Sequence, residues 1–210
     1  WRRIAAAVIA VSVGLTAANA AARTVAGPLT LPSSWQVAMC DVGQGDATLW
    51  RSGGAVALVD TGPDPGRLDT CLRRFGIDRL DLLVLTHFDL DHVGGTSAVA
   101  GRVDLVLHGP TGEPGDQRLL DSLCRPGTRV TRAEAGMTGT IGSTRWTALW
   151  PESTAVAGND ASIVIDVTGE NFPRTVLLGD LGAKSQAAWA RSVAVPDVRA
   201  ASTSWALAAS

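Results

Sequence analysis

The chain has 210 residues, of which 46% are hydrophobic and 18% are charged. This length fits one globular domain with a short additional segment, and this composition excludes a disordered chain. The formal net charge is only −2, so the composition gives no support for tight, nonspecific nucleic-acid binding through a basic surface, although an enzyme that holds phosphates through metal stays compatible with it.

The first 23 residues are predicted to form a membrane-type helix. Arg2 and Arg3 precede an uncharged run at 4–22 that is mostly Ala, Val, Ile and Leu, and about 20 such residues span a bilayer. As a transmembrane helix, this segment places the following domain outside the cytoplasm, because the basic residues precede it. A signal peptide is the alternative, since the small residues at 18–20 resemble a cleavage site, and it also exports the chain. A buried Ala-rich helix is the third interpretation.

A linker and a layered domain are predicted to follow. Residues 24–34 include two prolines and two serines, which is typical of a linker. Over 35–198, β-prone runs bounded by turn residues alternate with runs of helical spacing. The predicted strands are 35–42, 47–51, 55–60, 80–85, 103–107, 128–133, 144–150, 161–167 and 175–178, and the predicted helices are 66–75, 116–124 and 183–192.

Strands and helices in this order predict mixed sheets with helices packed on the outside, an α/β or α+β layered domain. The first three strands are expected to be antiparallel neighbours, because glycine-containing turns separate them. The continuous apolar run at 80–85 predicts a strand that is buried on both faces. Small residues dominate 199–210, which is predicted to be a tail outside the domain.

Cysteine usage leaves two interpretations open. Cys40, Cys71 and Cys124 are too few for a disulfide framework, and no two of them form a Cys-x-x-Cys metal pair. Core or surface thiols are the default. If the domain is exported, one disulfide with one thiol left over is the alternative.

Four side chains that can bind metal fall within six residues, directly after the strand predicted at 80–85. The sequence THFDLDH at 86–92 contains His87, Asp89, Asp91 and His92. A loop that leaves a buried strand can turn these side chains toward a common point, and histidine with carboxylate suits zinc, manganese or iron. A metal site is therefore predicted. The alternative is a polar loop whose histidines only cap the end of the strand.

This run resembles the His-x-His-x-Asp-His signature of the metallo-β-lactamase superfamily, with Asp89 in place of the second histidine. Three further motifs are DVGQGDA at 41–47, VDTG at 59–62 and LDLLVLTH at 80–87. Together the motifs resemble the C-terminal domain of the ComEC family of DNA-uptake (competence) proteins. The resemblance implies an αββα sandwich preceded by a membrane helix, and a metal-dependent phosphodiesterase or nuclease that acts on DNA during uptake.

The resemblance also implies a site with two divalent ions, zinc or manganese. His87 and Asp89 are expected to bind one ion, Asp91 and His92 the second, and Asp180 in LLGDL at 177–181 is expected to bridge them. Asp91 is the expected catalytic residue, which orients the attacking water between the paired ions. Taken alone, a Gly-Asp pair at the end of a strand also fits a plain turn.

Three further residues are expected around the site. Asp60 is predicted to organise the surrounding loops by accepting backbone N–H bonds in a tight turn. Asp46 and Asn159 are predicted to line the substrate cleft. The segment GNDAS at 158–162 lies where the wider superfamily supplies another histidine ligand, and the ComEC family has Asn there.

One motif of the ComEC family is missing from the 210 residues. Members carry a His-His-Gly-Ser segment shortly after the Gly-Asp strand and its helix, and this chain has none. The chain is therefore expected to be a truncated copy in which the second metal position lacks one protein ligand. Weaker metal binding and weaker activity are expected from this loss.

The expected partners are DNA, as a single strand or an incoming duplex, the membrane, and other competence proteins. The expected location is the cell membrane, with the hydrolase domain on the extracytoplasmic side. Two alternative functions remain: a noncatalytic membrane-attached module of the same fold, and a secreted lactonase or β-lactamase. The resemblance disfavours the last one, because those enzymes usually have histidine where Asp89 stands.

Overall fold

The computed structural model describes residues 1, 12, 14, 34–192 and 200–202. The membrane helix or signal peptide predicted at 1–23 and the linker predicted at 24–34 lie almost wholly outside these residues. Within the described ranges, none of the helices combines the length and hydropathy that a bilayer span requires.

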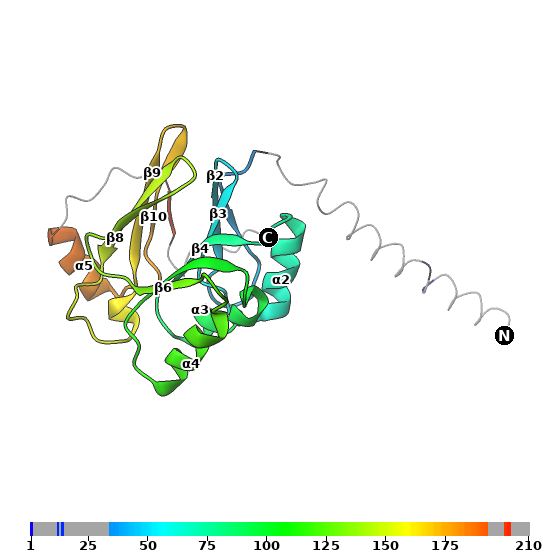
Figure 1. Ribbon diagram of the computed structural model, residues 1–210, viewed down its shortest axis with the longest axis horizontal. Helices are drawn as coiled ribbons and strands as arrows, with labels where there is room; N and C mark the ends of the chain where they lie inside the picture. The colour runs from blue at the N-terminus through cyan, green and yellow to red at the C-terminus, as the bar shows by residue number, and fades with distance from the viewer. Residues whose placement is uncertain (2–11, 13, 15–33, 193–199, 203–210) are drawn as a thin grey trace.

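Two β-sheets face each other, and helices cover their outer surfaces (Figure 1). The first sheet has the order β1-β2-β3-β4-β5-β6, and the second has the order β11-β10-β9-β8-β7. The first sheet contains β1 (Val37–Met39), β2 (Thr48–Ser52), β3 (Ala55–Val59), β4 (Leu80–Leu85), β5 (Val103–His108) and β6 (Arg129–Arg132). The second contains β7 (Thr138–Ile141), β8 (Thr144–Trp150), β9 (Val164–Gly169), β10 (Phe172–Leu177) and β11 (Ala200–Ser202).

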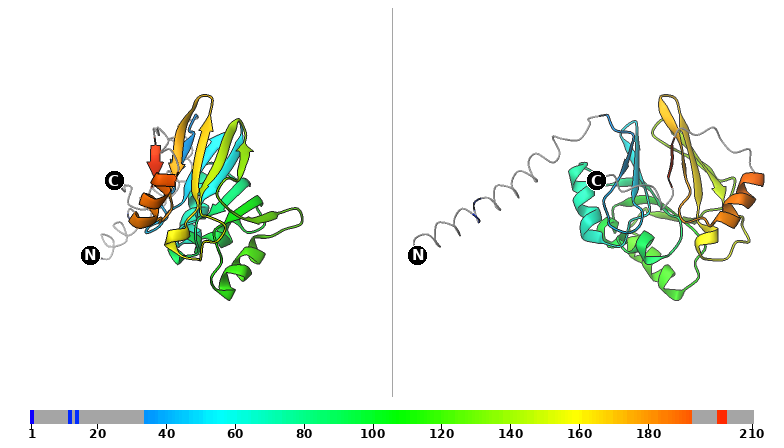
Figure 2. Two further views of the ribbon diagram at one scale, coloured as in Figure 1. Left: turned by 90° about the vertical axis from the view of Figure 1, so that its left-hand side faces the viewer. Right: turned by 180° about the vertical axis from the view of Figure 1, so that it is seen from behind.

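The helices lie outside the sheets and along one edge of them (Figures 1 and 2). Helix α2 covers the outer face of the first sheet, and α5 covers that of the second. The α-helices are α2 (Pro65–Arg74), α3 (Leu90–Val93), α4 (Pro114–Leu123) and α5 (Ala183–Ser192), and the 3-10 helices are η2 (Thr96–Val99) and η3 (Asn159–Ala161). The mixed α/β layered fold predicted from the sequence is confirmed.

Strand direction changes within the first sheet. The pairs β1–β2 and β2–β3 are antiparallel, as predicted, whereas β3, β4, β5 and β6 run parallel. In the second sheet β7, β8, β9 and β10 are antiparallel neighbours. Because parallel strands end at the same edge of a sheet, the loops that follow β3 and β4 are neighbours in space.

Strand β4 shows why the layers form. Leu82 and Val84 pack in the cluster between the two sheets, and Leu83 and Leu85 pack in the cluster on the helical side of the first sheet. Each fully buried leucine contributes about 2 kcal/mol through the apolar area that it removes from water. The strand predicted to be buried on both faces is therefore the central element of the domain.

Helix α2 begins at a well-defined cap. The Asp64 carboxylate accepts hydrogen bonds from the backbone N–H groups of Gly66 (2.7 Å) and Arg67 (3.2 Å), and Pro65 occupies the first helical turn. Leu68 and Leu72 form its buried face. The helix predicted at 66–75 is thus confirmed to within one residue at each end.

A disulfide joins Cys40, which directly follows β1, to Cys71 in α2, with 5.7 Å between the two Cα atoms. Cys124 is a free, exposed cysteine. The sequence left open either three thiols or one disulfide with one free thiol, and the structure has the disulfide.

Strand β11 lies inside the segment predicted to be a tail. It pairs in parallel with β10, with Thr175 opposite Ala200 and Leu177 opposite Ser202. Alanine and serine have low β-propensity, so neither composition nor periodicity indicates this strand. The backbone of β10 offers the hydrogen-bonding edge on which it forms.

Candidate metal centre

The predicted site residues lie at one edge of the domain, where strands of both sheets end. Asp60 directly follows β3, and His87 follows β4 after one residue. His92 lies in α3, the short helix that continues the same loop. Asp180 comes from the second sheet, just after β10. Residues from three separate parts of the sequence therefore converge between the sheets.

The core of the site is formed by His87, His92 and Asp180. Each offers one ligand atom, and these atoms all lie within 4.8 Å of one another. The Nε2 atom of His92 is 3.3 Å from Oδ1 of Asp180, and the centroids of the two imidazole rings are 4.1 Å apart. Both histidine side chains are almost fully buried, at 1% and 0% exposure. Two nitrogens and one carboxylate oxygen form a donor set that suits a divalent transition metal.

The hydrogen bonding of these atoms fits a metal centre. The Nε2 atoms of His87 and His92 and Oδ1 of Asp180 are buried, and none of them has a hydrogen-bond partner among the described residues. A buried polar atom without a partner costs about 1–3 kcal/mol. Three such atoms within 4.8 Å of one another fit a site that could hold a cation.

Asp89 and Asp91 stand at the solvent side of this core. Oδ2 of Asp89 is 3.6 Å from Nε2 of His87, and Oδ2 of Asp91 is 3.9 Å from Nε2 of His92. Their side chains are 56% and 36% exposed. The structure thus brings all five predicted ligands together, three of them with a buried ligand atom and two with side chains open to solvent. These five residues are called the metal centre below.

Asp60 holds the residues around both imidazoles in place. Its carboxylate accepts hydrogen bonds from the Thr86 backbone N–H (2.8 Å), from the Thr86 hydroxyl (2.7 Å) and from His92 Nδ1 (2.9 Å). The backbone of Asp60 has φ 58°, a left-handed conformation that costs a non-glycine residue about 1 kcal/mol or more. Asp60 therefore links the loop after β3 to the loop after β4 and contacts a metal-centre histidine directly.

These bonds determine which nitrogen of each imidazole carries the proton. Thr86 has one hydroxyl hydrogen and donates it to Asp60, so the 3.1 Å bond between its oxygen and His87 Nδ1 requires Nδ1–H as the donor. His92 donates its Nδ1–H to Asp60. Because Nδ1 carries a proton in both rings, Nε2 is the nitrogen of each imidazole that is left to bind a metal ion, and orienting it is the role of outer hydrogen-bond partners in metal sites.

Sequence reasoning missed Ser162 and the role of Thr86. The buried Ser162 hydroxyl lies 3.3 Å from His87 Nδ1. Asn159, predicted to line the cleft, is exposed at the start of η3, and its backbone carbonyl accepts from the N–H of Ser162. Both Asn159 and Ser162 belong to the GNDAS segment singled out in the sequence, so that segment was the available signal, and the serine is the residue that reaches the site.

Asp46 lies beside the metal centre on the loop 41–46, called the Asp46 loop below. Burial, together with the negative charge of Asp60, raises the pKa of Asp46 to about 6. The loop passes very close to α3, since a Cβ atom at Gly45 would lie 1.9 Å from the backbone oxygen of Asp91. The Asp46 carbonyl also accepts from the Gly62 N–H at 2.8 Å. Because Gly45 has no side chain, the loop can pass this close to Asp91, which explains the second glycine of the DVGQGDA motif.

The pKa values of His87 and His92 are shifted in opposite directions. Burial, and next the nearby His92, lower the pKa of His87. Burial also acts to lower the pKa of His92, but the hydrogen bond to Asp60 and the charges of Asp60, Asp180 and Asp91 outweigh it and raise the value to about 9. In the metal-free protein at neutral pH, His92 is therefore protonated and His87 is neutral.

Metal affinity is expected to increase with pH. Below about pH 9, a metal ion must displace the proton from His92 Nε2, so the apparent affinity for Zn²⁺ or Mn²⁺ should rise about tenfold per pH unit between pH 7 and 9 for that one proton. Calorimetric titrations in buffers of different ionisation enthalpy measure both the affinity and the proton release. The His108→Gln variant is the control, because His108 bonds to the Gly109 carbonyl at the end of β5. An affinity that does not change over this range would contradict the assignment of His92 as a ligand.

Comparison with known proteins agrees with this geometry. A sequence profile of the metallo-β-lactamase superfamily matches residues 40–131. ComE operon protein 3 of Bacillus subtilis (strain 168) is 28% identical over 179 residues, which are 72% of this chain and 23% of that protein. This chain therefore spans about a quarter of the length of that relative.

Solved structures show the same fold at low sequence identity. MEM-A1, a subclass B3 metallo-β-lactamase from a soil metagenome library, has a TM-score of 0.57 and 16% identity over 80% of this chain and 76% of that chain. A Cronobacter sakazakii metallo-β-lactamase with a HARLDQ motif has a TM-score of 0.56 and 15% identity over 81% of this chain and 80% of that chain. Residues 40–131 thus match the metallo-β-lactamase superfamily profile, and the domain has the layered fold of solved metallo-β-lactamases.

Proposed function

We propose that this domain is a metal-dependent phosphodiesterase that cleaves DNA during its uptake across the cell membrane. The metal centre carries this proposal, because three buried ligand atoms without partners lie next to two solvent-exposed carboxylates. The resemblance to the ComEC family and the similarity to ComE operon protein 3 support DNA as the substrate.

The ligand set favours phosphate chemistry. Asp89 contributes a carboxylate where the superfamily signature has histidine, so the open side of the site is richer in oxygen ligands and more suited to manganese or a similar hard ion. Two bound ions would stabilise charge on the phosphate oxygens and lower the pKa of a water molecule. The resemblance pairs His87 with Asp89 and Asp91 with His92, with Asp180 as the bridge. Because the ligand atoms of His87, His92 and Asp180 lie within 4.8 Å of one another, we propose instead that these three residues would hold the first ion, and that Asp89 and Asp91 would mainly hold the second.

The protein residues have separate roles in this mechanism. Asp60 and Thr86 keep both imidazoles oriented, so the site is preorganised before substrate arrives. The side chain of Asp91 is 36% exposed and its Oδ2 lies 3.9 Å from His92 Nε2, so it can contact a solvent-side nucleophile next to the buried ligand atoms. We propose that Asp91 orients the attacking water and accepts its proton.

The proposed location is the extracytoplasmic side of the membrane, with the membrane and other competence proteins as further partners. The Cys40–Cys71 disulfide supports an oxidising compartment, because structural disulfides are rare in the cytosol. Export is also what the apolar segment near the N-terminus predicts from sequence.

Metal-dependent cleavage of DNA by the purified chain tests the proposal. We expect cleavage with Mn²⁺ or Zn²⁺ and none with a chelator, and we expect Asp91→Asn to lower the rate about 100-fold or more, since it removes the proton acceptor. Asp121→Asn on the exposed face of α4 is the matched control and should leave the rate unchanged.

Two results would overturn the proposal. Substoichiometric metal binding with no DNA cleavage would identify a noncatalytic module of the same fold. Hydrolysis of lactams or lactones, with DNA left intact, would identify the lactonase or β-lactamase alternative.

A further inference from the structure

The Cys40–Cys71 disulfide joins two parts of the chain that border the metal centre. The Asp46 loop directly follows Cys40. Cys71 lies in α2, and the segment 60–64 leads from β3 directly into this helix. The disulfide therefore fixes the start of the Asp46 loop against the helix that follows the segment 60–64.

Both the Asp46 loop and the segment 60–64 contact residues of the metal centre. A Cβ atom at Gly45, in the Asp46 loop, would lie 1.9 Å from the backbone oxygen of Asp91. In the segment 60–64, the Thr61 N–H donates to the His92 carbonyl at 2.7 Å. These backbone contacts leave no free space, so a displacement of the Asp46 loop or of the segment changes the position of Asp91 or His92.

An ion pair also connects the Asp46 loop to α2, but it is open to solvent. Arg67 Nη1 lies 3.3 Å from Asp41 Oδ1, and the two side chains are 54% and 93% exposed. Exposed ion pairs contribute little to stability, because water and salt screen them. Opening the disulfide would therefore remove the stronger of these two connections between the loop and the helix.

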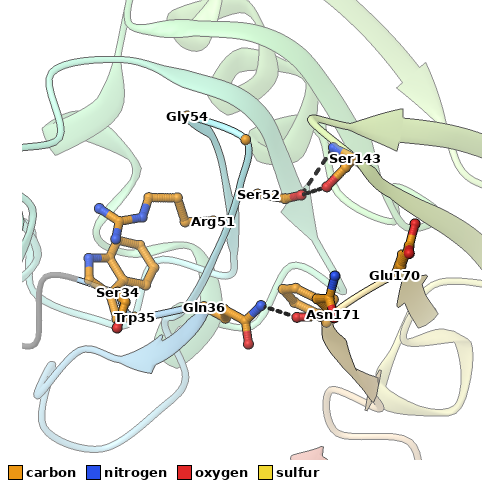
Figure 3. A pocket seen from close by; sticks show the side chains of 11 residues that line it. Ser34, Trp35, Gln36, Arg51, Ser52, Gly54, Ser143, Glu170 and Asn171 are labelled. Carbon is orange, nitrogen blue, oxygen red and sulfur yellow. Dashed lines mark hydrogen bonds between the residues drawn. The ribbon is translucent and has the colours of Figure 1, made fainter.

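Helix α2 has other anchors that do not depend on the disulfide. Leu68 and Leu72 are fully buried in the core. At the end of the helix, the Phe75 ring packs edge-on against Trp35, with 4.9 Å between centroids, and the Arg51 guanidinium lies 4.4 Å from the centre of the Trp35 ring. Figure 3 shows Trp35 and Arg51 together on one wall of a cavity of about 540 Å³. Opening the disulfide should therefore leave α2 in place and loosen the Asp46 loop.

Cys71 is the cysteine of the pair that a reductant can reach. It is partly buried and lines a groove of about 860 Å³ along α2, whereas Cys40 is 8% exposed in the hydrophobic core. One thiolate of a dithiol reductant would attack Cys71 Sγ, the bond between the protein sulfurs would break, and Cys40 would leave and take up a proton. The second thiol of the reductant would then attack its own sulfur in the mixed disulfide and release Cys71 as a thiol. Two electrons and two protons pass to the protein, and the dithiol becomes a disulfide.

We propose that the Cys40–Cys71 disulfide is a redox switch of the metal centre. The oxidised bridge holds the Asp46 loop against α3 and favours metal binding, and reduction by a dithiol loosens the loop and weakens metal binding. The switch rests on the proposed function only in that the metal centre binds a divalent ion, and it does not depend on DNA cleavage. Tight metal binding then requires an oxidising environment.

The test compares Mn²⁺ binding by the oxidised and the reduced full chain. Mn²⁺ is the probe because it prefers oxygen ligands to thiolates. Dithiothreitol is used for reduction and removed before the titration, and the number of free thiols should rise from one to three. We expect reduction to weaken Mn²⁺ binding about tenfold, and reoxidation to restore it. C40S/C71S should bind Mn²⁺ as the reduced wild type does, and Cys124→Ser, the matched control, should respond to dithiothreitol as the wild type does.

The coupling between metal and disulfide must be reciprocal. Saturating Mn²⁺ should therefore raise the ratio of reduced to oxidised dithiothreitol that opens half of the disulfides, by the same factor of about ten. An unchanged ratio would contradict the switch.

Hydrogen exchange of the metal-free chain shows whether reduction acts locally. Reduction should speed exchange of the Val42 and Gly62 N–H groups, which bond to the Cys40 and Asp46 carbonyls, and should leave β4 protected. Loss of protection in β4 would show that the whole domain unfolds, and it would overturn the switch. Unchanged exchange at Val42 and Gly62 would overturn it as well.

Two further outcomes separate the switch from the proposed function. If redox state changes Mn²⁺ affinity but the Mn²⁺-loaded chain does not cleave DNA, the switch stands and the proposed function fails. If the chain cleaves DNA but binds Mn²⁺ equally in both redox states, the proposed function stands and the switch is overturned.

Discussion

Replacing Asp60 with Asn is expected to lower the free energy of unfolding of the metal-free protein by about 3 kcal/mol and to weaken divalent-metal binding about 10- to 100-fold. Three donors point at the Asp60 carboxylate, two from Thr86 and one from His92. An amide has one oxygen and one NH₂ group, so at least one buried donor would face another donor. The loss of negative charge should also lower the pKa of His92 from about 9.

Three measurements check this expectation. Chemical denaturation gives the stability, metal titration gives the affinity, and NMR titration of the imidazole gives the pKa of His92. Asp166→Asn is the control, because Asp166 is also a mostly buried aspartate with a charged partner, Arg174 at 2.7 Å, but it lies in the second sheet. We expect Asp166→Asn to lower stability without changing metal affinity. If Asp60→Asn also left metal affinity unchanged, Asp60 would have only a structural role.

Removing the Cys40–Cys71 disulfide is expected to cost about 3–4 kcal/mol of stability. The bridge closes a loop with a sequence separation of 31 residues, and a loop of this size restricts the unfolded chain by about that free energy. C40S/C71S should therefore unfold at a markedly lower denaturant concentration than the wild type. Metal affinity should fall as well, because Cys40 is the residue from which the Asp46 loop starts.

Cys124 offers the matched control for the disulfide. Cys124→Ser removes an exposed thiol that forms no bridge and should leave the denaturation midpoint unchanged. A reducing agent should destabilise the wild type and Cys124→Ser equally, and it should have no effect on C40S/C71S. Equal stability of C40S/C71S and the wild type would show that the disulfide does not stabilise the domain.

The layered fold and the residues of the motif at 86–92 could be predicted because both depend on local sequence. Strand β4 is one continuous apolar run, and four potential ligands follow it within six residues. A strand end fixes where such a loop begins, so proximity in sequence becomes proximity in space. The short helix α3 begins at Leu90 in this loop, and its single turn contains both Asp91 and His92.

The remaining features depend on contacts between distant segments. Asp180 approaches His92 only because the second sheet packs on the first, and the family resemblance, not the residue pattern, singled it out. Ser162 and His87 are 75 residues apart, and no periodicity links a serine to a histidine at that distance. The pairing of Cys40 with Cys71 likewise depends on where α2 packs against the first sheet, and no local sequence pattern indicates that position.

The division of the metal centre between the sheets has a consequence for partly folded or cleaved chains. Both imidazoles belong to the first sheet, and the third buried donor, Asp180, belongs to the second. A chain cut in the connection between β6 and β7 would keep four of the five metal-centre residues on one fragment and leave Asp180 on the other. Metal binding by all three buried ligand atoms would then report that both sheets have been assembled.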